Sequence, residues 1–175
     1  VDPAPADDAM ERLEREGKTA MLVAVDGRVV GVVADADTVK ESAKRAVGEL
    51  RERGLAVHMI TGDNERTARA VAEEVGVDPE NVRAGVLPDE KADAVDDIQQ
   101  SGAEAMMVGD GVNDAPALAA AHVGVAIGSG TDVAIEAADV TLMRDDPYDV
   151  VKAIRVGEGT LAKIKQNLFW ALGYN

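Results

Sequence analysis

Between residues 35 and 143, short apolar runs alternate with amphipathic segments that often end at glycine. The apolar runs are continuous, which is typical of strands that are buried on both faces of a parallel sheet covered by helices. The alternation therefore predicts an α/β, Rossmann-like fold, with a doubly wound parallel sheet and helices on both faces. The predicted strands are 55–60, 81–86, 103–110, 123–128 and 139–143, and the predicted helices are 41–53, 65–75, 90–100, 115–121 and 132–138.

The flanking segments do not follow this alternation. Residues 9–16 predict a short charged helix, and residues 19–34 predict a β-hairpin because Asp26-Gly27 between apolar runs favours a type I′ turn. Residues 147–175 predict one long helix. We therefore divide the chain into three parts: residues 1–34, 35–150 and 151–175.

The predicted C-terminal helix begins basic and amphipathic and becomes apolar at Leu168. The apolar end is shorter than the roughly 20 residues that a bilayer crossing needs. Trp170 and Tyr174 nevertheless follow two lysines, which fits the cytoplasmic interface of a membrane where a span begins. A helix packed on the sheet explains the same composition, and both interpretations remain open.

Charge and composition exclude several classes of protein. The net charge is −15, from 33 acidic and 18 basic residues, so nucleic acid is not an expected partner. Without cysteine the chain has no disulfides, thiolate metal site or thiol nucleophile, and His58 and His122 are too few for a histidine metal site. The charge indicates either an ordinary acidic protein or a protein of a halophile. In a halophile, the high salt concentration of the cytoplasm screens the repulsion between carboxylates.

Two predicted strands end in loops that suit phosphate chemistry. Ligands bind at the carboxyl ends of strands in open parallel sheets. In "ITGDN", Thr61 and Gly62 stand directly before a predicted helix, whose N-terminal N–H groups favour an anion. In "VGDGVND", Asp110 and Asp114 would repel a phosphate unless a hard cation such as Mg²⁺ lay between them.

Lys91 adds a positive charge at the start of another predicted helix. A threonine, a lysine and paired aspartates around one point suit phosphoryl transfer, in which a protein mainly positions groups and neutralises charge. Each residue alone has an ordinary explanation, because aspartate is a common helix cap and lysine a common surface residue. The ordered set on successive strand ends is more specific than any member.

Four segments, "MITGDN", "VLPDEKADAV", "MVGDGVNDAPALAAAHVGVAIGSGTDVAIEAADVTLM" and "IKQNLFWALGYN", closely resemble the metal-transporting P-type ATPases of the haloacid-dehalogenase-like superfamily. The resemblance covers residues 17–175. It implies a heavy-metal export pump that works through an aspartyl-phosphate, with ATP and Mg²⁺ as cofactors, at the cytoplasmic face of the cell membrane. The closing Tyr174-Asn175 resembles the copper(I) subgroup, in which this pair helps to bind the transported ion.

The resemblance also assigns roles to the residues of the strand-end loops. It implies that Thr61 and Gly62 form the loop that holds the transferred phosphoryl group, and that Asp63 lies near the ATP phosphates and Mg²⁺. Lys91 corresponds to the lysine that neutralises phosphoryl oxygens, and Asn113 to a residue that contacts the phosphoryl group. Asp110 corresponds to a Mg²⁺ ligand, and Asp114 to the carboxylate that supports the Mg²⁺ cluster.

Three motifs of the family do not occur in this chain: Asp-Lys-Thr-Gly-Thr with the phosphorylated aspartate, the His-Pro pair of the nucleotide domain, and the membrane Cys-Pro-Cys. Residues 1–34 are then interpreted as the end of a nucleotide-binding domain and residues 37–40, "DTVK", as the hinge into an incomplete phosphorylation domain. Its expected partner is the missing N-terminal half of the pump.

The resemblance places the missing first strand in the middle of the sheet, between the strands that end at Thr61 and Asp110. The chain is therefore expected to show either a gap there or a strained pairing of residues 59–60 with residues 107–108. Two other functions remain open. One is a soluble phosphatase of the same superfamily, and the other is a non-catalytic protein that binds Mg²⁺ or a partner half.

Overall fold

The computed structural model describes residues 3–35, 38–128 and 132–174. An N-terminal unit, residues 3–35, holds helix α1 (Asp7–Arg15) and the antiparallel hairpin of β1 (Thr19–Val25) and β2 (Arg28–Asp35). Asp26 and Gly27 have φ values of 50° and 77°, which are the positive angles of a type I′ turn and confirm the predicted hairpin. Helix α1 begins at Asp7, two residues before the predicted start.

The α/β unit follows the predicted order of elements. Its helices are α2 (Glu41–Glu52), α3 (Glu65–Val75), α4 (Lys91–Gln99), α5 (Ala115–Ala120) and α6 (Asp132–Ala137), and its strands are β3 (Met59–Ile60), β4 (Val82–Arg83), β5 (Met106–Gly109), β6 (Val123–Ile127) and β7 (Val140–Leu142). The strands are shorter than predicted because a strand extends only as far as a neighbour offers hydrogen bonds. The difference is largest for β3 and β4.

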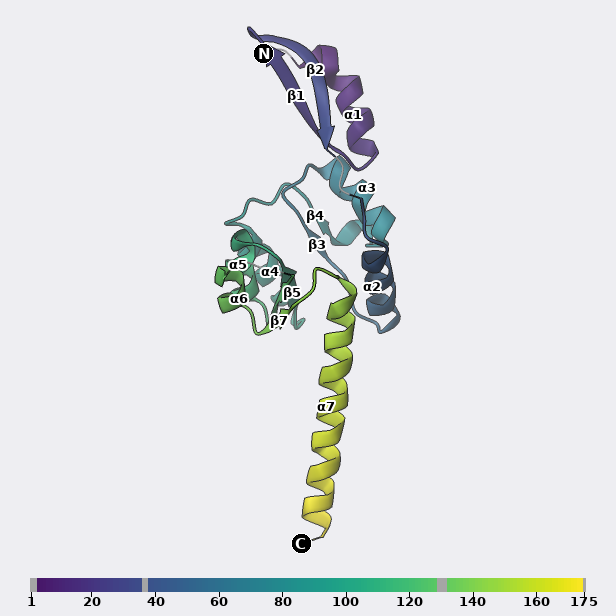
Figure 1. The fold of residues 1–175 in the computed structure, drawn as a ribbon, viewed down its shortest axis with the longest axis vertical. Helices are drawn as coiled ribbons and strands as arrows, with labels where there is room; N and C mark the ends of the chain where they lie inside the picture. The colour runs from purple at the N-terminus through teal and green to yellow at the C-terminus, as the bar shows by residue number, and fades with distance from the viewer. Residues whose placement is uncertain (1–2, 36–37, 129–131, 175) are drawn as a thin grey trace.

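The parallel strands form two separate sheets. One contains β3 and β4, and the other has the order β5-β6-β7. Within the described ranges β3 and β5 are not paired, so the predicted gap is present and the alternative of a strained pairing is wrong. Helices α2 and α3 lie beside the first sheet and α4, α5 and α6 beside the second (Figure 1).

Small aliphatic side chains fill the core. One cluster packs Ala72, Val75 and Val77 against partly buried residues such as Met59. Helix α5 approaches β6 so closely that a Cβ on Gly124 would lie 2.6 Å from the Leu118 carbonyl oxygen. The expectation of strands buried on both faces fails for β5, where Met106 and Val108 are 41% and 37% exposed, because the sheet is open beside them.

Helix α7 (Tyr148–Gly173) extends away from the rest of the chain (Figure 1). Only its first turns, including Tyr148 and Val151, are buried, in a cluster with Ala46 of α2. The described residues 155–174 are all exposed, although Glu158 still pairs with Arg53 at 3.0 Å, so the interpretation of a C-terminal helix packed on the sheet is wrong. None of the helices in the described part of the chain combines the length and the apolar composition that a bilayer crossing requires.

Polar contacts hold the base of α7. The Tyr148 hydroxyl donates to Glu49 of α2 at 2.8 Å, and Arg155 donates to the same carboxylate. On the other side, Arg144 and Lys152 both bind the Asp149 carboxylate, at 2.7 and 2.6 Å. Hydrogen bonds from Arg144 and then from Lys152 lower the pKa of Asp149 from 3.8 to about 2.

This lowered pKa predicts an acid-sensitive joint. The carboxylate contributes stability that is fully present above the unfolded pKa of 3.8 and is lost as the pH falls towards about 2. We therefore expect Asp149→Asn to lower the melting temperature at pH 7 and to reduce its fall between pH 4 and pH 2. Circular dichroism across this range measures both effects. A fall of equal steepness in the variant would contradict the assignment.

Candidate functional site

The loop after β3 is held against the end of β4. The Thr61 N–H donates to the Arg83 carbonyl at 3.0 Å, and the Gly85 N–H donates to the Asp63 carbonyl at 2.7 Å. The Thr61 hydroxyl donates to Asp63 Oδ2 at 2.9 Å and accepts from the Asp63 N–H at 3.1 Å. Asn64 then caps α3 by accepting from the N–H groups of the helix's second and third residues.

The loop after β5 closes around Asp114, which is only 7% exposed. Its Oδ2 accepts from the N–H groups of Asp110 and Gly111 at 3.3 and 3.4 Å. Its Oδ1 binds Lys91 Nζ at 2.6 Å, and both side chains of this pair are largely buried. Gly109 is required here, because a Cβ at this position would lie 2.6 Å from the Asp114 Cβ.

The structure brings together only some of the predicted site residues. Lys91 and Asp114 meet, while Asp110 and Asn113 are exposed at the same loop. Thr61, with Gly62 and Asp63, lies on the other side of the sheet gap, and no hydrogen bond between described residues joins the two loops. Lys91, which was predicted to face phosphate, is thus paired with Asp114 in this structure. The spacing of the two residues in the sequence did not reveal this pair.

The donor set for Mg²⁺ is incomplete. Asp114 already binds Lys91 and two backbone N–H groups, so Asp110 supplies the only exposed carboxylate of the pair. No group of three acidic, histidine or cysteine side chains among the described residues is placed to hold a metal ion. The arrangement fits a hard cation only if oxygen ligands also come from phosphate, water or another segment.

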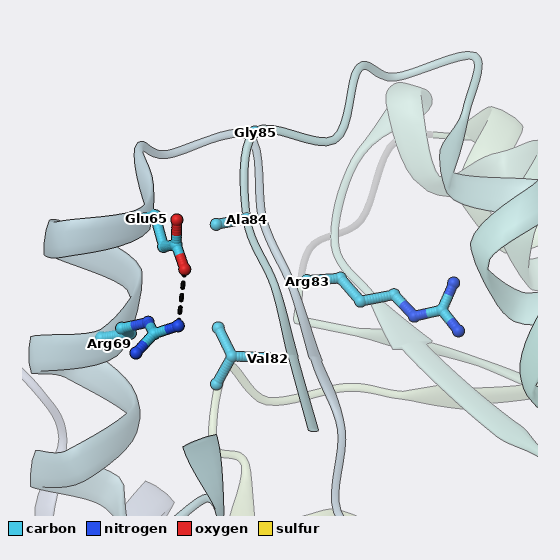
Figure 2. A pocket seen from close by; sticks show the side chains of 6 residues that line it. All are labelled: Glu65, Arg69, Val82, Arg83, Ala84 and Gly85. Atoms are coloured by element: carbon cyan, nitrogen blue, oxygen red, sulfur yellow. Dashed lines mark hydrogen bonds and ion pairs between the residues drawn. The ribbon is translucent and has the colours of Figure 1, made fainter. Parts of the chain in front are cut away.

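A hollow of about 470 Å³ beside β4 holds none of the predicted site residues. Figure 2 shows Glu65 and Arg69 of α3 on one side of β4, joined by a 2.6 Å ion pair, and Arg83 turned to the other side. There Arg83 pairs with Asp97 at 3.0 Å. The two arginines therefore do not converge on a common ligand.

A smaller hollow of about 270 Å³ does include a predicted site residue, Asp63. It lies between the N-terminal unit and α3. Thr19 of β1 also lines it and donates its hydroxyl to Asp63 Oδ1 at 3.3 Å. Sequence reasoning missed Thr19, and no local signal marks it, since it lies 44 residues from its partner.

The remaining predicted residues are Tyr174 and Asn175. Tyr174 is 96% exposed and directly follows α7, whose end lies far from both loops (Figure 1). Asn175 lies outside the described residues, so the structure does not test the predicted ion-binding pair.

Comparison with known proteins supplies the family. A family model described as a haloacid dehalogenase-like hydrolase matches residues 4–122. The chain belongs to the haloacid dehalogenase-like hydrolases. This membership accounts for strand-end loops that carry threonine, lysine and aspartate, because ligands bind at this edge of an α/β sheet.

This haloacid dehalogenase-like chain is also similar to copper-exporting P-type ATPases. It is 55% identical over 166 residues to one from Bacillus subtilis (strain 168) and 51% identical over 173 residues to one from Staphylococcus aureus (strain MRSA252). These matches cover 95% and 99% of the chain but 20% and 21% of the relatives, so the chain spans about a fifth of their length.

A solved structure agrees with this similarity. The crystal structure of a zinc-transporting PIB-type ATPase in the E2.Pi state matches with a TM-score of 0.79 and 41% identity, covering 98% of this chain and 28% of that one. The resemblance to metal-transporting P-type ATPases is confirmed.

The Lys91–Asp114 pair gives a stability prediction for this haloacid dehalogenase-like chain. Lys91→Met leaves a buried carboxylate without its countercharge, and we expect a loss of about 3 kcal/mol, the lower end for a broken buried pair. Urea unfolding followed by circular dichroism, at a constant concentration of trimethylamine oxide to favour the folded state, measures it. Arg69→Met is the control, because its pair with Glu65 is exposed and contributes about 0.5 kcal/mol or less. Equal losses in the two variants would contradict the importance of the buried pair.

Proposed function

We propose that this chain is the second half of the catalytic unit of an ATP-driven pump that exports a heavy-metal cation, copper, through an aspartyl-phosphate intermediate. The observation that carries the proposal is the 55% and 51% identity to copper-exporting P-type ATPases over nearly the whole chain. In this proposal the phosphorylated aspartate belongs to an N-terminal half, because the chain has no Asp-Lys-Thr-Gly-Thr motif.

The three parts of the chain have separate tasks in this pump. Residues 1–34 form the end of a nucleotide-binding domain, residues 35–150 an incomplete phosphorylation domain, and residues 151–175 a linker helix and the start of a transmembrane helix. The hairpin supports the first assignment, since Met21 and Val30 are 51% and 61% exposed and would pack against further strands. At the end of α7, Phe169 and Trp170 are 69% and 65% exposed, which fits the cytoplasmic face of a membrane.

The site residues act by position and charge. When phosphate is bound, the Thr61 hydroxyl turns from Asp63 and donates to the phosphoryl group, and Lys91 neutralises the phosphoryl oxygens. Asp114 is a positioning residue, because it holds both Lys91 and the N–H groups of the loop that carries Asp110. Mg²⁺, when bound at Asp110, would supply the charge neutralisation that lets phosphate approach the acidic loop. Asp63 then lies near the ATP phosphates, and Asn113 contacts the phosphoryl group.

The exposed position of Asp110 predicts weak magnesium binding by this chain alone. We expect a dissociation constant in roughly the millimolar range, because Mg²⁺ dehydrates reluctantly and most of its oxygen ligands are missing. Isothermal titration calorimetry measures it, with Asp110→Asn as the test variant and Asp93→Asn, on α4, as the control. Micromolar affinity that survives Asp110→Asn would contradict the site.

The transport proposal is tested with the complete pump that contains this segment. We expect it to restore growth of a copper-sensitive bacterial strain on copper, and Asp110→Asn to abolish that growth at equal protein level. Resistance to zinc but not to copper would overturn the choice of ion. Resistance to neither metal would overturn the pump and favour the soluble phosphatase or the non-catalytic protein that binds Mg²⁺ or a partner half.

A further inference from the structure

Glu14 is a buried carboxylate that none of the proposed chemistry uses. It lies at the end of α1 and is 7% exposed. Both of its oxygens bind groups at the start of α3: Oε1 accepts from Asn64 Nδ2 at 3.1 Å, and Oε2 accepts from Arg66 at 2.8 Å. A buried carboxylate is costly to leave unpaired, so this contact strongly favours one placement of α1 on α3.

Asn64 joins this contact to the loop after β3. Its Oδ1 caps α3 by accepting from the N–H groups of Arg66 and Thr67, while its Nδ2 donates to Glu14. The next residue along the loop towards β3 is Asp63. The Asn64 side chain therefore connects the cap of α3 with the N-terminal unit, one residue away from the candidate phosphate loop.

Two further contacts follow from the same docking. The Thr67 hydroxyl donates to the Lys18 carbonyl at 3.0 Å, which brings the start of β1 against α3. Thr19 then donates to Asp63 Oδ1, while Thr61 donates to Asp63 Oδ2. Both oxygens of Asp63 are thus engaged, and one of the donors belongs to the N-terminal unit.

We propose that Glu14 is a positioning residue that docks the N-terminal unit on α3 and thereby sets the orientation of the Asp63 carboxylate through Thr19. When the unit is undocked, Asp63 loses its Thr19 donor and keeps Thr61. The docking itself is independent of the proposed pump. Only its consequence for nucleotide binding rests on the proposed role of Asp63, so the two ideas fail separately.

A disulfide provides a direct assay of docking. A Cβ on Gly17 would lie 3.8 Å from the Ala70 Cβ, close to the roughly 3.8 Å of natural disulfides. The chain has no cysteine of its own, so Gly17→Cys/Ala70→Cys allows a single pairing. Gly17 has a φ of +74°, which disfavours cysteine. The same pair is therefore used in every variant, so that this cost is shared.

We expect rapid oxidation of this cysteine pair in the parent chain and oxidation about tenfold slower in the Glu14→Lys variant. The lysine places a second cation beside Arg66 and removes the hydrogen bonds that the Glu14 carboxylate accepts. Adding Arg66→Glu to Glu14→Lys restores opposite charges and should restore the rate, which loss of helix structure alone would not allow. Arg69→Gln is the matched control on α3, because Arg69 pairs with Glu65 of its own helix. Its rate should equal that of the parent.

A second measurement applies if Glu14→Lys unfolds the chain. Arg66→Gln changes only an exposed side chain but removes the cation that pairs with Glu14. Spin labels at the exposed positions Arg28 and Glu73 should therefore show a broader distance distribution in Arg66→Gln than in the parent. Equal crosslinking rates in the parent and in Glu14→Lys would overturn the proposal. So would slow crosslinking in the parent, failure of the rescue, or an unchanged distance distribution in Arg66→Gln.

Discussion

Incubated with ATP and Mg²⁺, the chain of 175 residues is expected to form no acid-stable, hydroxylamine-labile phosphoenzyme. No residue of the chain matches the aspartate that the family phosphorylates, and loss of a covalent nucleophile costs other enzymes about 10⁶-fold in rate. Labelling with radioactive ATP, followed by acid precipitation, measures the product. Measurable labelling of the purified chain would contradict the assignment.

Adding an N-terminal half that carries Asp-Lys-Thr-Gly-Thr is expected to restore labelling on that half. Asp110→Asn in the present chain should then abolish it, because Asp110 is the exposed carboxylate proposed to hold Mg²⁺. Asp93→Asn is the matched control and should leave labelling unchanged. Labelling that is equally strong in all variants would show that the N-terminal half acts without this site.

The second large effect concerns folding. We expect the isolated chain to be marginally stable or to aggregate, because the facing edges of β3 and β5 have no hydrogen-bonding partner strand among the residues that the structure describes. A missing central strand also removes packing, which is visible in the exposure of Met106 and Val108 on β5. Light scattering, together with amide hydrogen exchange of both strands, measures the effect. Cooperative unfolding of a soluble monomer with slow exchange in β3 and β5 would contradict it.

A charge on the open strand tests whether this edge is responsible. Val108→Lys should reduce aggregation, since a lysine on an edge strand opposes pairing with another chain. Val133→Lys is the control, because Val133 is 50% exposed on α6, away from the gap. If both lysines reduce aggregation equally, net charge rather than the open edge explains the effect.

Local signals predicted the hairpin and the order of elements. The Asp26-Gly27 turn depends on backbone angles at two adjacent residues, and the alternation of apolar runs and helices depends on periods of a few residues. The resemblance placed the missing strand between β3 and β5, but it left open whether these strands would pair with each other or leave a gap, and the structure decided for the gap. The features that were predicted depend on residues near one another in the chain.

Only the tertiary structure decided how distant side chains pair. Lys91 and Asp114 are 23 residues apart, and Arg66 lies 52 residues from Glu14, so both contacts depend on how whole helices dock. The direction of α7 was likewise open from composition, because an apolar helix end suits both a sheet and a membrane interface. Packing of Tyr148 against Ala46 of α2 fixes the direction in which α7 leaves the α/β unit. The periodicity within α7 contains no information about its packing against α2.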